Sequence, residues 1–157
     1  MDVLYKDENN NLKHILCNDH RPNPAFINEF QTSQFTLKLL SIEIVEKNLD
    51  SYYVEDGWLF VLFHVEIRNN TNEIIEIYKD DFNVCLNNND IYEIEDNFNI
   101  QYQLNDLLVL KPLETLKGNY ICIIDKKIKK LDFHYTEYFD EEYFKQYHLR
   151  YKLEQSV

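Results

Sequence analysis

The chain has 157 residues, enough for one domain with a sizeable core, and its formal net charge is −12. Such an acidic chain repels phosphate backbones and anionic membrane surfaces, which argues against nucleic-acid and membrane partners and favours a basic one. No window reaches the roughly 18 apolar residues of a membrane span, and the N-terminus lacks the features of a signal peptide. If Met1 is the natural start, these features and the odd number of cysteines predict a cytoplasmic protein with reduced thiols.

The first third of the chain changes from a polar segment to an alternating one. Residues 1–33 are polar, with Arg21-Pro-Asn-Pro24 breaking any regular element, so we expect an irregular arm with one weak strand at Asp2 to Tyr5. From Phe35 apolar and polar residues alternate, and the phase of this alternation shifts at Leu39-Leu40. The shift predicts a β-bulge in a long strand.

The strand that begins after Gly57 is the most apolar segment of the chain. One of its faces is wholly apolar and consists of Leu59, Val61, Phe63, Val65 and Ile67. The other face is apolar where the strand begins and polar where it ends, in the order Trp58, Phe60, Leu62, His64, Glu66 and Arg68. This pattern predicts a central strand that is buried on both sides at its start and on one side at its end. We expect Asn69-Asn-Thr-Asn72 to form the following turn, because such residues tolerate the left-handed region and form side-chain-to-backbone hydrogen bonds.

Short alternating segments separated by turn residues continue the pattern. We expect strands at residues 74–78, 80–86, 116–124 and 128–135, and short apolar segments at residues 91–92 and 107–110. The acidic, asparagine-rich residues 93–106 predict a long surface loop, and the basic run Asp125-Lys-Lys-Ile-Lys-Lys130 predicts a solvated connection between two strands. This organisation is typical of an antiparallel β-sandwich.

The last residues fit two kinds of secondary structure. Phe139, Tyr143 and Tyr147 are spaced by four, and acidic residues precede basic ones, as in a helix. Residues 147–153 instead alternate between apolar and polar, as in a strand. We predict a short helix over residues 138–145 followed by a strand.

Residues 35–135 resemble a bacterial immunoglobulin-like family of domains of unknown function that is common in Gram-positive lipoproteins and secreted proteins. The matching residues are Gly57, Phe60-Val61, Val65-Glu-Ile-Arg-Asn-Asn-Thr71, Asp81-Phe82, Ile91-Tyr92, Lys111-Pro112, Gly118 and Leu131-Asp-Phe133. Leu113 stands where the family has the glycine of a Pro-Gly turn, and the chain carries no lipobox to support the family's extracytoplasmic location. The resemblance implies an all-β fold, an Ig-like antiparallel β-sandwich with Greek-key connections, and no catalytic residues.

Pattern and resemblance together predict three regions. We expect an N-terminal arm over residues 1–33, the Ig-like β-sandwich over residues 34–136, and a short C-terminal extension, helix or strand, over residues 137–157.

Two segments have the chemistry of metal ligands but not the spacing of a metal site. The segment His14 to His20 contains two histidines, a cysteine and an aspartate, yet it lacks the paired knuckles of a zinc site. Residues 90–96 offer four carboxylates to calcium without the glycine and regular spacing of a calcium loop. We therefore expect solvated polar segments, no metal and no cofactor.

Candidate catalytic and cysteine chemistry is equally sparse. His64 and Glu66 share a face, and His134 could join them for acid–base work, but no nucleophile motif accompanies them. We expect solvated strand faces and no catalytic residues. Cys85 and Cys122 both fall in predicted strands, where free buried thiols are favoured over a bridge.

Twelve tyrosines exceed what one small core needs. Tyrosine offers apolar area with a polar tip and is enriched in recognition surfaces. The candidate partner-binding residues are Tyr138, Tyr143, Tyr147 and Tyr151. The alternative is core filling combined with the codon bias of a low-GC Gram-positive bacterium, which would also explain the abundant asparagine, lysine and isoleucine.

The sequence favours a non-catalytic Ig-like module that binds another protein, with an exposed strand edge as a route to a homodimer. An acidic inhibitor or immunity-type protein that binds a basic partner is the alternative. A hydrolase that uses His64 or His134 ranks third, and no small-molecule substrate is evident.

Overall fold

The computed structural model describes residues 3–6, 12–19, 28–87 and 90–155, with side chains described for residues 28–87 and 90–152. Within these ranges the regular elements are strands, apart from one 3-10 turn, η2 (Lys79–Asp81). The strands are β1 (Val3–Lys6), β2 (Leu12–Asp19), β3 (Glu29–Gln31), β4 (Phe35–Val45), β5 (Asn48–Leu49), β6 (Tyr52–Tyr53), β7 (Trp58–Asn69), β8 (Ile75–Tyr78), β9 (Phe82–Leu86), β10 (Asp90–Glu93), β11 (Leu107–Leu110), β12 (Thr115–Asp125), β13 (Lys130–Tyr138) and β14 (Phe144–Gln155).

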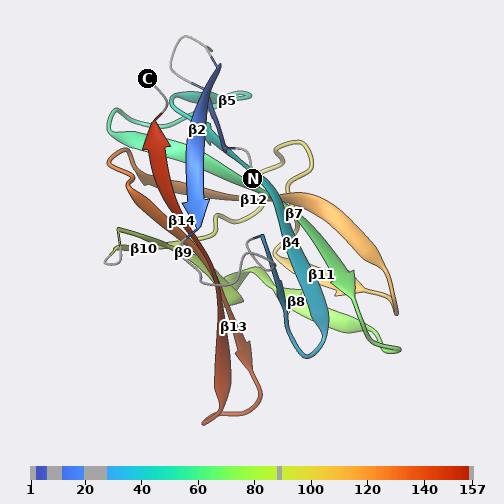
Figure 1. Cartoon of the computed structure of the whole chain (residues 1–157). Coiled ribbons are helices and arrows are strands. Elements are labelled where there is room, and N and C mark those ends of the chain that lie inside the picture. The colour runs from blue at the N-terminus through green and yellow to red at the C-terminus, as the bar shows by residue number, and fades with distance from the viewer. Residues whose placement is uncertain (1–2, 7–11, 20–27, 88–89, 156–157) are drawn as a thin grey trace.

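One long sheet dominates the molecule (Figure 1). Its strand order is β10-β9-β13-β14-β2-β1-β4-β7-β12, with β3 added beside β4, while β8 pairs with β11 and β5 pairs with β6. The described pairs are antiparallel except β1 with β4. The sheet brings β7 and β13 to face each other across the core, where the rings of Phe63 and Phe133 lie 4.7 Å apart. The predicted all-β fold, an antiparallel sandwich, is confirmed.

The apolar face of β7 forms the centre of the core, as its alternation predicts. Leu59, Val61, Phe63, Val65 and Ile67 are at most 1% exposed. Buried residues of β4 and β12 flank them on the two sides, and Phe82, Val84 and Leu86 of β9 point inward as expected. Burying each large apolar side chain stabilises the fold by about 1.5–3 kcal/mol.

A β-bulge interrupts β4 where the sequence predicts it. The register with β7 shifts between Leu39 and Ser41, so that Leu39 and Ile42 are both buried while Leu40 is exposed. The extra residue keeps both halves of β4 directed at the core.

The outer face of β7 is covered over only half its length. Phe60 and Leu62 pack in a second apolar cluster with Val54 of the β6–β7 region and Ile100 of the loop before β11. His64, Glu66 and Arg68 continue this face with increasing access to solvent. Apart from Trp58, which is 40% exposed, the strand thus changes from buried on both sides to buried on one side, as predicted.

The turn after β7 is held by the side-chain-to-backbone hydrogen bonds that the sequence predicts, without a residue in the left-handed region. None of residues 69–72 has a positive φ. Asn69 is instead fully buried; its Nδ2 group donates to the carbonyls of Glu73 at 2.7 Å and Lys111 at 3.0 Å, and its Oδ1 accepts from the Thr71 amide at 2.9 Å. Because these partners lie on both sides of the turn, Asn69 joins β7 to the start of β8 and the end of β11.

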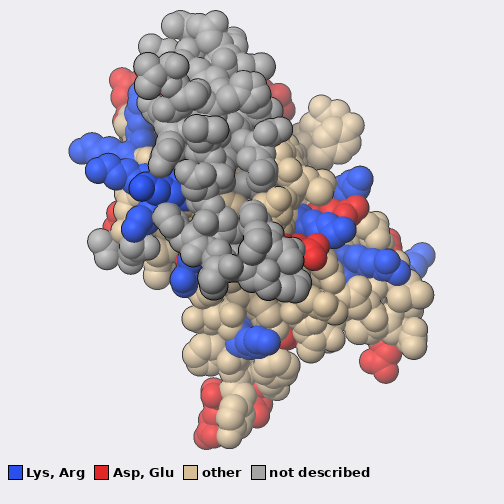
Figure 2. All heavy atoms as spheres, viewed as in Figure 1, with Lys and Arg blue, Asp and Glu red and all other residues tan. Residues whose placement is uncertain are grey.

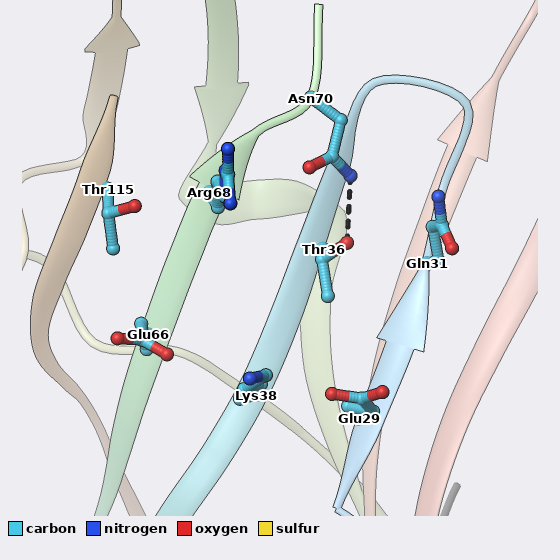
Figure 3. Close-up of a pocket in the computed structure, with 8 residues that line it drawn as sticks. All are labelled: Glu29, Gln31, Thr36, Lys38, Glu66, Arg68, Asn70 and Thr115. Carbon is cyan, nitrogen blue, oxygen red and sulfur yellow. Dashed lines mark hydrogen bonds between the residues drawn. The ribbon is translucent and has the colours of Figure 1, made fainter. Parts of the chain in front are cut away.

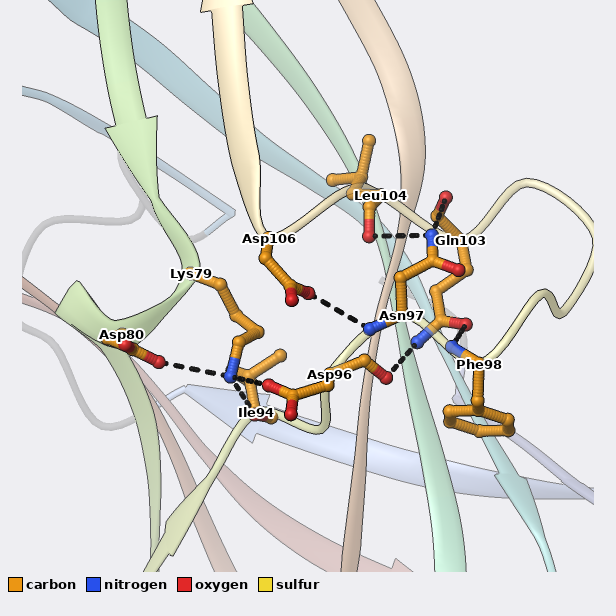
Figure 4. Close-up of polar contacts among 9 residues, drawn as sticks. All are labelled: Lys79, Asp80, Ile94, Asp96, Asn97, Phe98, Gln103, Leu104 and Asp106. Carbon is orange, nitrogen blue, oxygen red and sulfur yellow. Dashed lines mark hydrogen bonds and ion pairs between the residues drawn. The ribbon is translucent and has the colours of Figure 1, made fainter.

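Residues 94–106 form the long irregular loop that the sequence predicts, but the loop is well anchored (Figure 4). The buried Lys79 donates to the carbonyl of Ile94 at 3.0 Å and pairs with Asp96 at 2.7 Å and Asp80 at 3.0 Å. Leu104, near the end of the loop, packs into the core. These contacts hold the loop against η2 and the core.

Two predictions of secondary structure are wrong. Residues 1–33 were expected to be irregular apart from a strand at Asp2 to Tyr5; β1 covers part of that strand, but β2 and β3 are additional. These strands form by long-range pairing, β1 with β4 and β2 with β14, which a local pattern does not reveal. The segment Arg21-Pro-Asn-Pro24 lies outside the described residues.

The helix predicted over residues 138–145 is also absent. Tyr138 ends β13 and pairs with Phe144 of β14, and a tight turn joins the two strands. The Asp140 carboxylate accepts from the amides of Glu142 at 2.8 Å and Tyr143 at 2.9 Å, which favours a turn over a helix. The C-terminal extension is therefore a strand, the second of the two forms expected.

Candidate functional site

The polar end of β7 forms the floor of a groove of about 360 Å³ on the outer face of the sheet (Figure 3). Side chains of β3, β4, β7 and β12 stand on this face, and the turn after β7 adds Asn70. The residues that line the groove are Glu29, Gln31, Thr36, Lys38, Glu66, Arg68, Asn70 and Thr115.

Cross-strand register arranges these side chains in two rows. One row runs Glu29, Lys38, Glu66 and Lys117 across β3, β4, β7 and β12. Its charges alternate, and Lys117 pairs with Glu66 at 3.8 Å. Opposite charges directly across strands stabilise a sheet, so this row largely neutralises itself.

The second row has a single charge. It runs Gln31, Thr36, Arg68 and Thr115. Thr36 accepts a hydrogen bond from the Asn70 amide at 2.7 Å. Arg68 makes no ion pair within the described part of the chain, whereas Arg150 pairs with Asp132 at 3.3 Å. The groove thus contains one guanidinium without an ion pair among the described residues, flanked in its own row by neutral hydrogen-bonding groups.

A histidine network lies next to the groove on the same face. His64 contacts the Glu43 carboxylate at 3.2 Å through Nε2 and the Asn119 amide oxygen through Nδ1. The hydrogen bond that His64 donates to the Glu43 carboxylate raises the pKa of His64 above its ordinary 6.5, and partial burial opposes that rise. The network favours a protonated, orienting histidine and contains no nucleophile.

A second candidate site is the tip of the β13–β14 hairpin, which projects from the body of the protein (Figure 1). Four aromatic side chains there are more than half exposed: Tyr138, Phe139, Tyr143 and Phe144 at 65%, 57%, 66% and 58%. The turn between them contains Asp140-Glu-Glu142, and Figure 2 shows acidic residues gathered at this tip. We call residues 138–144 the aromatic tip.

The structure separates the four predicted tyrosines. Tyr138 and Tyr143 lie in the aromatic tip. Tyr147 is half-buried, stacks on Phe30 with ring centroids 5.2 Å apart and donates to Glu137 at 3.0 Å; burial raises its pKa to about 12. Tyr151 is 1% exposed and belongs to the core. Only the first two have surface to offer a partner.

Sequence reasoning missed part of each site. Phe139 enters the sequence prediction only through its helical spacing, and Phe144 does not enter it. The alternating pattern that begins near Phe144, after the acidic turn, is nevertheless a usable signal. The groove was missed because its rows join β3, β4, β7 and β12, which are far apart in sequence.

The candidate catalytic residues are not brought together. Phe63 and Phe133 meet inside the sandwich, so the adjacent His64 and His134 point to opposite outer faces. His134 is buried beside His148, with ring centroids 4.5 Å apart, and burial followed by the charge of His148 lowers its pKa. Glu66 pairs with Lys117 instead of an imidazole.

Cys85 and Cys122 are both free thiols, as predicted, but only Cys122 is buried. In the part of the chain with described side chains, no three His, Cys, Asp or Glu residues are grouped to hold a metal ion. Asp96 of the acidic loop pairs with Lys79 instead. The side chains of His14 to His20 lie outside the described residues.

These features define an antiparallel β-sandwich protein with two polar or aromatic surfaces. Among the described residues, no helix is both long and apolar enough to span a membrane. No family model and no curated protein matches the chain.

Several solved structures from Gram-positive bacteria are similar. The Bacillus subtilis ycdA protein, a candidate lipoprotein, has 14% identity and a TM-score of 0.65 over 81% of this chain and 39% of its own. The Bacillus subtilis yjhA protein has 14% identity and a TM-score of 0.56 over 69% and 78% of the two chains. A functionally unknown protein from Listeria monocytogenes has 10% identity and a TM-score of 0.55 over 85% and 86%. The matched region thus spans well under half of ycdA, and at these identities the likeness shows the fold alone.

Proposed function

We propose that this protein is a non-catalytic β-sandwich module that binds a protein partner through its aromatic tip. The observation that carries the proposal is the exposure of four aromatic side chains on one projecting hairpin. Large aromatic side chains supply most of the binding energy at protein interfaces when they become buried. An enzyme is disfavoured because His64 and His134 face opposite sides, and the ring nitrogens of His64 contact Glu43 and Asn119 instead of the hydroxyl of the neighbouring Ser41.

The tip is also built to hold its aromatic residues in place. The Phe139 amide donates to the Tyr143 carbonyl at 2.9 Å, and the Asp140 carboxylate accepts two backbone amides. Tyr138 and Phe144 pair across the strands with ring centroids 6.3 Å apart. A turn that is already ordered loses less entropy when a partner binds.

The charge of the tip supports the second candidate function, an acidic inhibitor of a basic partner. Glu141 and Glu142 are exposed between the aromatic residues. Cations of a partner would therefore meet both aromatic faces and carboxylates. Binding to such a partner should weaken with added salt, whereas a purely apolar contact should not.

The proposal is tested by placing a photo-crosslinking phenylalanine analogue at position 139 in the native host. The matched control carries the same analogue at Tyr53, which is 76% exposed on the other hairpin, β5–β6. We expect one protein to be crosslinked from position 139 and not from position 53. This crosslink should be lost when Tyr143→Ser and Phe144→Ser are combined with the analogue at position 139. Equal crosslinking from both positions, or none from position 139, would contradict the proposal.

The same experiment distinguishes a homodimer from a complex with a different protein, because two crosslinked copies of this chain have twice the mass of one chain.

The location of the protein is a separate part of the proposal. The free thiols of Cys85 and Cys122 support the cytoplasm, while the lipoprotein description of ycdA supports an extracytoplasmic site. Cell fractionation with an antibody against the chain distinguishes the two.

A further inference from the structure

We propose that the groove over β3, β4, β7 and β12 binds a carboxylate group, with Arg68 as its anchor. This site is on the sheet face, and the proposal does not depend on the aromatic tip. It rests on the charge arrangement of the groove and on the register of its strands.

The charge arrangement singles out Arg68. In the row of Glu29, Lys38, Glu66 and Lys117 each acid is opposite a lysine, so the row has no net charge to offer. In the neighbouring row Arg68 has no acidic partner, although the whole chain has a net charge of −12. In a protein so rich in carboxylates, a guanidinium left without one is available to a carboxylate from outside.

The neighbours of Arg68 complete a hydrogen-bonding site. Thr36 is directly opposite Arg68 on β4, and Thr115 is directly opposite it on β12. Side chains in such positions are about 4.5–5.5 Å apart at their Cβ atoms. The Thr36 oxygen already accepts from Asn70 at 2.7 Å, so its hydroxyl hydrogen is free to donate. A carboxylate held by the guanidinium fork would therefore be within reach of a hydroxyl on each side.

Two further features restrict the ligand. A planar guanidinium matches a carboxylate through two parallel N–H···O bonds, which lysine cannot reproduce. The lysines of the neighbouring row each face a glutamate, so the groove offers no second uncompensated cation to a more highly charged anion such as a phosphate ester. The site therefore suits a singly charged carboxylate, from a small organic acid, an acidic side chain or a peptide C-terminus.

The backbone beneath the site is rigid. β7 is hydrogen-bonded to β4 on one side and to β12 on the other. Asn69, which directly follows Arg68, is held in place by the hydrogen bonds of its buried side chain. Arg68 is thus mounted between two fixed positions on a central strand, which reduces the cost of ordering the site on binding.

The proposal is tested by two-dimensional ¹H–¹⁵N NMR of the full chain, following the Arg68 Nε–Hε signal during titration with sodium acetate. Sodium chloride at equal ionic strength is the reference. We expect a saturable shift at Arg68 with acetate only. In Arg68→Gln and Arg68→Lys, which lack this signal, binding is followed through the backbone amide signals of Thr36 and Thr115, the neighbours of position 68 on β4 and β12. We expect at least tenfold weaker binding in Arg68→Gln and weakened binding in Arg68→Lys, because lysine keeps the charge but not the fork. Arg150→Gln is the matched control and should bind acetate as the unsubstituted protein does.

Peptide probes distinguish the sources of the carboxylate. Acetyl-tetraalanine with a free C-terminus, its C-terminal amide, and acetyl-Ala-Asp-Ala-amide separate a terminal carboxylate from a side-chain carboxylate and from a small acid. Shifts of equal size at Arg68 and Arg150, an equal response to chloride, or unchanged acetate binding in Arg68→Gln would overturn the proposal. Because Arg68 is exposed, we expect its substitution to leave the fold intact, and the backbone amide spectrum of each variant checks this.

Discussion

Replacing Asn69 by aspartate should destabilise the protein strongly, although the substitution exchanges a single NH₂ group for an oxygen. The Nδ2 group donates to the carbonyls of Glu73, Lys111 and Leu110 at 2.7, 3.0 and 3.2 Å inside the protein. In Asn69→Asp a carboxylate oxygen would face these three carbonyl oxygens. Because the NH₂ group has two hydrogens, the three carbonyls share two donated hydrogen bonds, and their loss costs about 1 kcal/mol each. A buried unpaired charge adds about 2 kcal/mol or more.

We therefore expect the free energy of unfolding to fall by about 4 kcal/mol at pH 7. Urea unfolding followed by the fluorescence of Trp58, the only tryptophan, measures this change. With a slope of about 2 kcal/mol/M, the midpoint should fall by about 2 M. The matched control is Asn72→Asp, which adds the same charge at an exposed position of the same turn and should change stability by less than about 0.5 kcal/mol.

The pH dependence of the variant separates charge from shape. Surrounding carbonyls and burial would raise the pKa of the new carboxyl above its unfolded value of about 3.9. The unfolded chain then binds fewer protons than the folded one between these two pKa values, so stability rises as the pH falls through that window. The gap between Asn69→Asp and Asn72→Asp should narrow between pH 7 and pH 4. Equal stability of the two variants at pH 7, or a gap independent of pH, would refute the role assigned to Asn69.

Three further predictions concern the backbone and the histidines. Leu113 has a φ of 61°, so Leu113→Gly should be more stable than Leu113→Ala by about 0.5–1 kcal/mol in urea unfolding, since only glycine adopts this conformation without strain. Gly118→Ala should lower the free energy of unfolding by about 1–3 kcal/mol, because the new Cβ would lie 2.4 Å from a Leu104 methyl carbon and 2.9 Å from the Tyr102 carbonyl oxygen; an unchanged urea midpoint would contradict this. NMR titration should give a pKa above 6.5 for His64 and below 6.5 for His134, and Glu43→Gln should lower the pKa of His64 alone. His64 then contributes stability below pH 6.5 that is lost as the pH rises through its folded pKa. His134 contributes stability above pH 6.5 that is lost as the pH falls through its folded pKa.

The core strands were predictable because their side chains alternate with a period of two. Leu59 to Ile67 form an unbroken apolar face that only a buried strand explains, and the phase shift at Leu39-Leu40 identified the β-bulge. Leu113 departs from the turn glycine of the family it resembles, yet it still adopts a positive φ.

The remaining parts depend on pairing between distant segments. β1 and β2 have little apolar alternation and are held by backbone hydrogen bonds to β4 and β14. At the C-terminus, the spacing of Phe139 and Tyr143 imitates a helix, whereas the Asp140 carboxylate and the pairing of Tyr138 with Phe144 decide for a hairpin. The aromatic tip was therefore located in sequence through Tyr138 and Tyr143 but given the wrong shape.

The loop that covers part of the edge of β12 affects how this sandwich can bind a partner. A strand edge with free backbone groups is a template for pairing with another chain. Along β12, however, the Asn119 amide donates to the Tyr102 carbonyl at 2.8 Å, the Asn119 carbonyl accepts from Leu104 at 2.9 Å, and the Ile121 carbonyl accepts from Glu95 at 2.8 Å. The loop that makes these bonds is itself anchored by Lys79. Adding a strand to this part of β12 would require breaking the hydrogen bonds of that anchored loop. The aromatic tip and the Arg68 groove are already open to solvent. Recognition through these side chains therefore costs the fold less than recognition through the β12 edge.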